Sequence, residues 1–214
     1  MLSIETLVTF ISISTFLCFL PGPDNILVLS QSAINGCKYG ILITIGLCIG
    51  LVIHTSLVSL GIAAIIQANT LAFKIIKLFG VFYLIYLAWG AFKAKPIHIK
   101  SNTKSFNDTK KFIKKGLFMN LSNPKVIIFF LAFLPQFTTD NTIAISVSLQ
   151  LLYLGLIFVV IAFIVFTIIS YLSGFLNKMI SSKPSVQTIL NKITSLIFIV
   201  LAINLCIDQR LPIV

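Results

Sequence analysis

The stretch FLPGPDNILVLS, Phe19 to Ser30, decides how this chain is organised. It lies inside apolar sequence, yet it carries two prolines and an aspartate. A proline lacks the backbone N–H and clashes with the preceding turn, so a helix does not continue undisturbed through Pro21 and Pro23. A charge at the centre of a membrane costs about 2.5–3.5 kcal/mol, so Asp24 requires an explanation. We therefore predict a membrane helix that is broken beside a charged residue.

The composition indicates an integral membrane protein. The 214 residues are 58% hydrophobic and only 10% charged, and the mean hydropathy is +1.08, whereas soluble domains carry about 25% charged residues. Several apolar runs reach the roughly 20 residues that a transmembrane helix needs. We expect an all-α polytopic protein of about six transmembrane helices, with no large domain outside the membrane. The expected spans are Ile4–Leu29, Ile41–Ile66, Leu78–Phe92, Gly116–Phe137, Ile143–Leu172 and Leu190–Ile207.

The connection between the third and fourth spans, residues 93–115, is strongly basic. It holds eight lysines and a single acidic residue, Asp108. Cytoplasmic loops of membrane proteins carry an excess of lysine and arginine, so we expect this loop in the cytoplasm, where it can attract anionic membrane lipid. Nucleic-acid binding is the other interpretation of a basic run. The position between two membrane spans and the absence of interleaved aromatic residues argue against it.

The fourth span repeats the interruption of the first. In FMNLSNPKVIIFFLAFLPQF, Phe118 to Phe137, a shift of 101 residues aligns Pro124 with Pro23 and Lys125 with Asp24. Three spans, a cytoplasmic connection and three more spans form the layout of an inverted-topology repeat. We therefore predict a first three-helix repeat over residues 1–92 and a second over residues 116–214, with the loop 93–115 between them.

The broken segments are the best candidates for a binding site. Freed backbone groups survive at membrane depth only where they line a cavity, and such interruptions mark substrate sites in transporters with inverted repeats. A proline fits the first position of a restarted helix, and Asn123 suits the N-cap of a half-helix that begins at Pro124. Both half-helices would direct the positive ends of their dipoles into the membrane. Asn120 lies close to the second break.

The charges at the two breaks admit two interpretations. Asp24 and Lys125 either pair with one another in a purely architectural ion pair, or they bind the two charged groups of a ligand. An α-amino acid carries an ammonium and a carboxylate on one carbon. We therefore hypothesise that Asp24 binds the ammonium of an amino acid while Lys125 binds its carboxylate. Asp24 is also the better candidate for a proton acceptor.

Other polar and small residues have less specific roles. His54 either relays protons or donates one hydrogen bond between helices. Tyr83 is deep enough in the third span to face a cavity. Four glycines are spaced for close helix contact and are compatible with a homodimer; they are Gly36, Gly40, Gly46 and Gly50.

With these residues in view, the chain resembles the LysE/RhtB family of bacterial amino-acid exporters. The similarity covers most of residues 1–140, and its motifs occur in the order typical of that family. They are PGPDNILVLS (Pro21–Ser30), GCKYGILITIGLCIG (Gly36–Gly50), LFGVFYLIYLAWGAFK (Leu78–Lys93) and GLFMNLSNPKVIIFFLAFLPQF (Gly116–Phe137). The last span lacks the glycines that many members show.

The resemblance implies a secondary transporter that exports small amino acids or close derivatives across the bacterial cytoplasmic membrane, driven by the proton gradient. It implies a role at the two breaks, which carries over to Pro21, Gly22, Pro23, Asp24 and Asn25 in the first and to Asn123, Pro124 and Lys125 in the second. No enzymatic activity, cofactor or metal site is expected. Binding of the amino acid and of protons is expected instead.

Two alternatives to amino-acid export remain open from the residues. Metal-cation efflux is known in distant relatives of the fold, but the few intramembrane carboxylates and the lack of a histidine–cysteine cluster argue against it. A membrane thiol oxidoreductase would need cysteines that face one another at the breaks. Cys18 lies near the first break, but no cysteine lies near Lys125.

Overall fold

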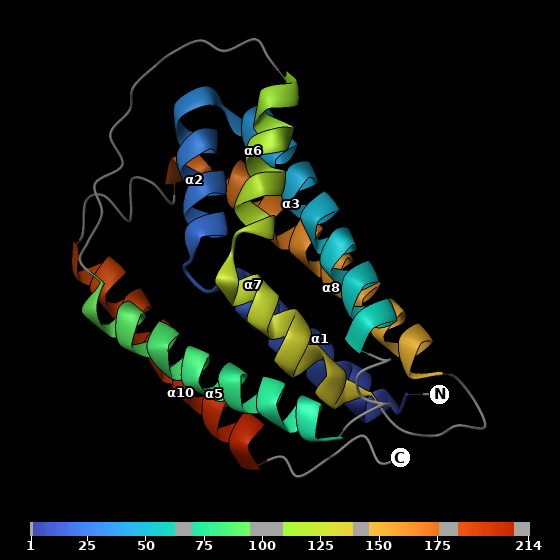
Figure 1. Cartoon of the computed structure of the whole chain (residues 1–214). Coiled ribbons are helices and arrows are strands. Elements are labelled where there is room, and N and C mark those ends of the chain that lie inside the picture. Colours follow the sequence, from blue (N-terminus) through green and yellow to red (C-terminus); the bar gives the residue numbers. More distant parts are fainter. Residues whose placement is uncertain (1, 63–69, 95–108, 139–145, 176–183, 208–214) are drawn as a thin grey trace.

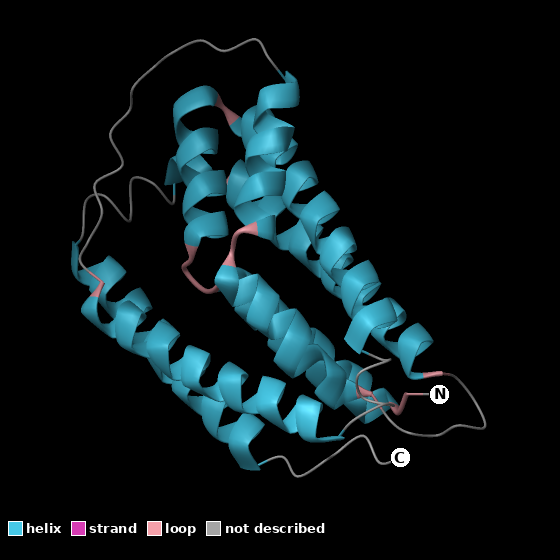
Figure 2. Cartoon of the chain, in the orientation of Figure 1, coloured by secondary structure: helices cyan, strands magenta, loops and turns pink. Residues whose placement is uncertain are grey.

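The computed structural model describes residues 2–62, 70–94, 109–138, 146–175 and 184–207. Every element in these ranges is a helix, as Figure 2 shows. Four helices are long and apolar enough to cross a membrane, and two bent helix pairs bring the number to six if each pair is one span. The predicted all-α polytopic fold is therefore confirmed. Most of the basic loop, residues 95–108, lies outside the described residues.

The first span is broken where the prolines predict. Helix α1 (Ile4–Phe19) and helix α2 (Pro23–Asn35) meet at an angle of 56°. Pro23 occupies the first turn of α2, where its missing N–H has no helical partner to lose. Gly22 is the N-cap of α2 and has an extended backbone.

The fourth span is broken in the same way. Helix α6 (Thr109–Leu121) and the segment Pro124–Phe137 meet at 52°. That segment begins as α-helix α7 (Pro124–Ile128), widens to the π-helix η2 (Phe129–Phe133) and tightens to the 3₁₀-helix η3 (Leu134–Phe137). Pro135 explains the change, because it cannot donate to the carbonyl of the preceding turn and its ring would clash there.

The unbroken spans differ from the predicted ranges mainly at their ends. They are α3 (Cys37–Leu57) with its π-helical continuation η1 (Val58–Ile62), α5 (Thr70–Lys93), α8 (Val147–Tyr171) and α10 (Pro184–Ile207). Helix α6 begins seven residues before the predicted start of the fourth span, inside the stretch expected to be loop. The buried side chain of Phe112 stabilises this lysine-rich first part of α6. Hydropathy alone does not predict it as part of a membrane span.

The helices form a central group and a separate pair, as Figure 1 shows. In the central group α3 packs against α2, α6 and α8, and α8 also packs against α1 and α2. Helices α5 and α10 pack against each other and lie beside the lower half of the molecule. The first broken span ascends in this view and the second descends, and α3 and α8 also run in opposite directions. This arrangement suits an inverted repeat, although the division at residues 92 and 116 stays a prediction.

Close contact between α3 and α6 depends on glycine. A Cβ on Gly46 would overlap the carbonyl oxygen of Ile113, and a Cβ on Gly116 would overlap that of Ile43. Gly50 faces the Asn120 side chain in the same interface. Such small residues allow two helix backbones to approach within van der Waals distance.

The other two glycines of the predicted spacing have different surroundings. Gly40 faces Ser32 and Ser170, so it also packs within the chain. Gly36 instead has φ +101° and open space around it, and it permits the turn between α2 and α3. Three of the four glycines thus contact other helices of the same chain, so they give no argument for a homodimer. The homodimer stays a prediction.

We predict that Gly46→Ala destabilises the protein by about 1–3 kcal/mol, because the backbone carbonyl of Ile113 cannot yield as a flexible side chain does. Gly90→Ala is the matched control, since a Cβ on Gly90 meets nothing within 4 Å. Thermal unfolding of the detergent-solubilised protein measures the difference. Equal melting temperatures for the two variants would contradict this account of the α3–α6 contact.

Candidate functional site

Side chains satisfy the carbonyl groups that the first break sets free. Pro21 has no N–H to donate to the Leu17 carbonyl one turn earlier, and the chain leaves the helix before Gly22 can donate to Cys18. The Lys125 ammonium donates instead to the carbonyls of Leu17 and Leu20, each at 3.5 Å. The side-chain amide of Asn25 donates to the Cys18 carbonyl at 2.7 Å. The end of α1 is therefore held by one residue of its own repeat and one residue of the other break.

The second break is closed by the predicted N-cap. Asn123 has an extended backbone, and its Oδ1 accepts from the Lys125 N–H at 3.1 Å. Pro124 occupies the first turn of α7. Both features confirm the sequence prediction. Together they fix the point at which Lys125 leaves the helix and can reach the end of α1.

Asp24 lies in the first turn of α2 and is only 2% exposed. Its Oδ2 accepts from the Asn120 amide nitrogen at 3.5 Å, while its Oδ1 has no hydrogen-bond partner among the described residues. The Asn120 side chain is fully buried and its own Oδ1 is likewise unpartnered there. Burying a polar group without a partner costs about 1–3 kcal/mol. This part of the structure therefore has unused capacity to bind a ligand.

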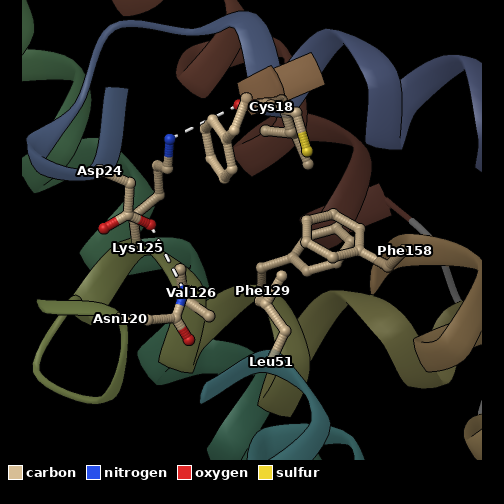
Figure 3. Close-up of a pocket in the computed structure, with 10 residues that line it drawn as sticks. Cys18, Asp24, Leu51, Asn120, Lys125, Val126, Phe129 and Phe158 are labelled. Atoms are coloured by element: carbon tan, nitrogen blue, oxygen red, sulfur yellow. Dashed lines mark hydrogen bonds between the residues drawn. The ribbon is translucent and has the colours of Figure 1, made fainter. Parts of the chain in front are cut away.

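Asp24 and Lys125 face one cavity but do not form a contact ion pair. Figure 3 shows the Lys125 ammonium directed toward the end of α1 and the Asp24 carboxylate directed toward Asn120. The two charges still interact electrostatically across the cavity. The purely architectural ion pair is thus not the observed arrangement. Each charged group keeps hydrogen-bonding capacity.

The remainder of the cavity wall is apolar. Phe129, Phe158 and Phe166 line it together with Leu51 and Val126. The Phe129 and Phe158 rings lie 4.7 Å apart between centroids. Two opposite charges and an amide at one end, with aromatic rings at the other, complement the charged groups of a zwitterion, which enters this cavity of about 30 Å³ only when its walls move apart. Cavities of this kind fix a ligand through a few polar groups in an apolar wall.

Four of the polar residues predicted for the site do not line this cavity: Asn25 and Asn123, which bond the backbone at the two breaks, and His54 and Tyr83. His54 is 9% exposed, it interacts with the backbone of Asn120 and with the charge of Asp24, and its Nε2 has no hydrogen-bond partner among the described residues. It therefore lies next to the site without lining the cavity. Tyr83 lies on α5 with its ring 5.8 Å from that of Tyr86, and it does not line the cavity.

Sequence reasoning missed several residues of the site. Cys18 lines the cavity and was considered only for redox chemistry; its position in the last turn before Pro21 was the available signal. The aromatic residues of α8 gave no signal, because that helix is apolar on every side. The structural role of Asn25 could have been foreseen, since a buried amide beside a proline break is a natural donor to a freed carbonyl.

Comparison with known proteins gives a consistent result. The sequence model of a family described as LysE type translocator matches residues 15–209. The chain is 29% identical over 207 residues to a leucine efflux protein of Salmonella typhimurium (strain LT2), with 94% of each protein covered. It is 28% identical over 204 residues to the uncharacterized membrane protein YrhP of Bacillus subtilis (strain 168), with 91% of this chain and 95% of that protein covered. No solved structure matches the chain.

We predict that Asp24 and Lys125 are energetically coupled although they do not touch. In a double-mutant cycle, Asp24→Asn combined with Lys125→Met should be less destabilising than the two single substitutions added together, by about 0.5–3 kcal/mol. Each single substitution leaves one uncompensated buried charge, whereas the double substitution leaves none. Equilibrium unfolding in detergent measures the four stabilities. Additivity within about 0.5 kcal/mol would show that the two charges are independent.

Proposed function

Because the chain belongs to the LysE type translocator family, we propose that it exports α-amino acids from the cytoplasm in exchange for protons, with leucine as the first substrate to test. The family is one of translocators, so the expectation of a transporter rather than an enzyme is confirmed, and the oxidoreductase interpretation is set aside. The leucine efflux relatives favour amino acids over metal cations. They also suggest leucine in particular.

One observation carries the proposal. A buried carboxylate with an oxygen that has no partner among the described residues and a half-buried ammonium line the same cavity, where the two broken spans meet. Asp24 can accept hydrogen bonds from a substrate ammonium, and the Lys125 ammonium can donate to a substrate carboxylate. Charge-assisted hydrogen bonds of this kind are about twice as strong as neutral ones. The Asn120 side-chain amide donates to Asp24 Oδ2 and so orients the carboxylate.

Competition at Asp24 explains how export could be coupled to protons. The carboxylate is poorly solvated, so it is stabilised either by a substrate ammonium or by a proton, but not by both at once. Departure of the amino acid then favours uptake of a proton, and loss of that proton favours binding of the next amino acid. One proton moving through about 100 mV supplies about 2.3 kcal/mol, which sustains a concentration ratio of roughly fiftyfold.

The proposed location is the bacterial cytoplasmic membrane. The chain is a multi-pass membrane protein, and its relatives come from Salmonella and Bacillus. Large apolar side chains such as Phe79, Phe82 and Leu196 are exposed on α5 and α10, where membrane lipid would cover them. The basic loop 93–115 is proposed to face the cytoplasm.

Asp24→Asn should abolish proton-coupled leucine transport and weaken leucine binding at least about tenfold, because a hydrogen bond to a charged group contributes about 1.5–3 kcal/mol. The measurement uses proteoliposomes with labelled leucine, an imposed pH gradient and an internal pH dye. Glu5→Gln is the matched control, since it removes an exposed carboxylate on the same half-helix pair. Unchanged leucine and proton flux in correctly inserted Asp24→Asn would refute the proposal.

The orientation of the basic loop can be tested by labelling. In a background without the four native cysteines, Ser101→Cys should react with a membrane-impermeant maleimide in inside-out vesicles and be protected in right-side-out vesicles, because lysine-rich loops remain in the cytoplasm. The reverse pattern would overturn the orientation and leave the amino-acid site untouched.

A further inference from the structure

We propose that the apolar side chain of the transported amino acid lies in a second cavity, between helices α5 and α10 and the broken segment α7–η2. This inference rests on the proposed function and adds to it the residues that select the substrate. The second cavity is lined by Leu84 of α5 and by Phe198, Leu201 and Leu205 of α10. Among its lining residues, Lys125 is the only charged one.

The two cavities share one wall. Leu17, Lys125 and Phe129 line both of them. An amino acid with its ammonium at Asp24 and its carboxylate at Lys125 places its α-carbon beside this wall. Its side chain can then extend from the α-carbon into the second cavity while both charged groups remain in the first.

The first cavity is the larger of the two, about 30 Å³ against about 20 Å³, but aromatic rings close its end opposite the charged groups. Its aromatic end is occupied by rings in mutual contact, with the Phe158 centroid 4.7 Å from that of Phe129 and 5.5 Å from that of Phe130. A substrate side chain could enter only by separating these rings. The second cavity is lined mainly by aliphatic side chains, and it lies where α5 meets α7 and η2. Separating α5 and α10 slightly from the central helices would enlarge it without disturbing that ring cluster.

Gly80 sets the size of the second cavity. A Cβ on Gly80 would lie 2.6 Å from the Cβ of Ala132 and 3.2 Å from Cδ2 of Leu205. Both of those residues line the second cavity. An added methyl group would therefore displace α5 from this wall and change the size of the cavity. In apolar pockets one methylene group changes discrimination about 10–200-fold, so such changes should alter which amino acids are accepted.

The test is a competition assay with the full chain in proteoliposomes. Transport of labelled leucine is measured against unlabelled alanine, leucine and phenylalanine. Leu201→Ala, which enlarges the second cavity, should shift the preference toward phenylalanine about tenfold relative to leucine. Leu84→Phe, which fills part of the second cavity, should shift it toward alanine by a similar factor. Because the two shifts have opposite directions, a general loss of folding cannot produce both.

Two further variants make the outcome decisive. Leu196→Ala lies on the same helix with a side chain that is 61% exposed, and it should leave the preference unchanged. Phe158→Leu changes the first cavity alone. If Phe158→Leu shifts the preference while Leu201→Ala and Leu84→Phe do not, the second cavity is not the side-chain site and the proposed export stands. If the unsubstituted protein transports no amino acid, the proposed function fails, and the assignment fails with it.

Discussion

The contact between Lys125 and the end of α1 is the constraint on which the rest of the structure depends. Pro21 cannot donate to the Leu17 carbonyl, which accepts from the Leu20 N–H at 3.3 Å, and within a membrane no bulk water adds a second donor. The ammonium of the opposite break supplies it. The same contact places a half-buried positive charge at the negative end of a helix dipole, where it is stabilised. The first break thus draws a donor from the second, so the two halves of the chain must meet at the centre of the molecule.

Much of the fold followed from the sequence because each break has a local chemical signature. Proline fixes where α2 and α7 begin, and Asn123 provides the expected cap. The early start of α6 could not be predicted from hydropathy, because its first turns are rich in lysine although Phe112 and the close approach of Gly116 to α3 pack the helix against the molecule. Pro135 was a visible signal for the altered turns of η2 and η3, but its consequence depends on the packing of Phe129 to Phe133.

The site divides into a part that sequence can predict and a part that it cannot. Asp24, Asn120 and Lys125 are conspicuous because polar groups in apolar sequence need partners, and the structure brings all three to one cavity. The apolar walls are a different matter. Helices α8 and α10 carry apolar residues on most sides, so no periodicity distinguishes Phe158 or Leu201 from their lipid-facing neighbours. Tyr83 illustrates the same difficulty, since depth in the span did not place it at the cavity.

The polar groups of the site do not all have short hydrogen bonds within the protein. Both hydrogen bonds from Lys125 are long, at 3.5 Å, compared with about 2.7–3.2 Å for well-formed ones. Asp24 and Asn120 each keep an oxygen without a partner among the described residues. A ligand carboxylate at Lys125 would compete with the carbonyls of Leu17 and Leu20, and occupancy would then be felt directly at the bend between α1 and α2. If every polar group at the site already had a hydrogen-bond partner, the protein would be more stable. Ligand binding would then not alter the hydrogen bonds at the bend between α1 and α2.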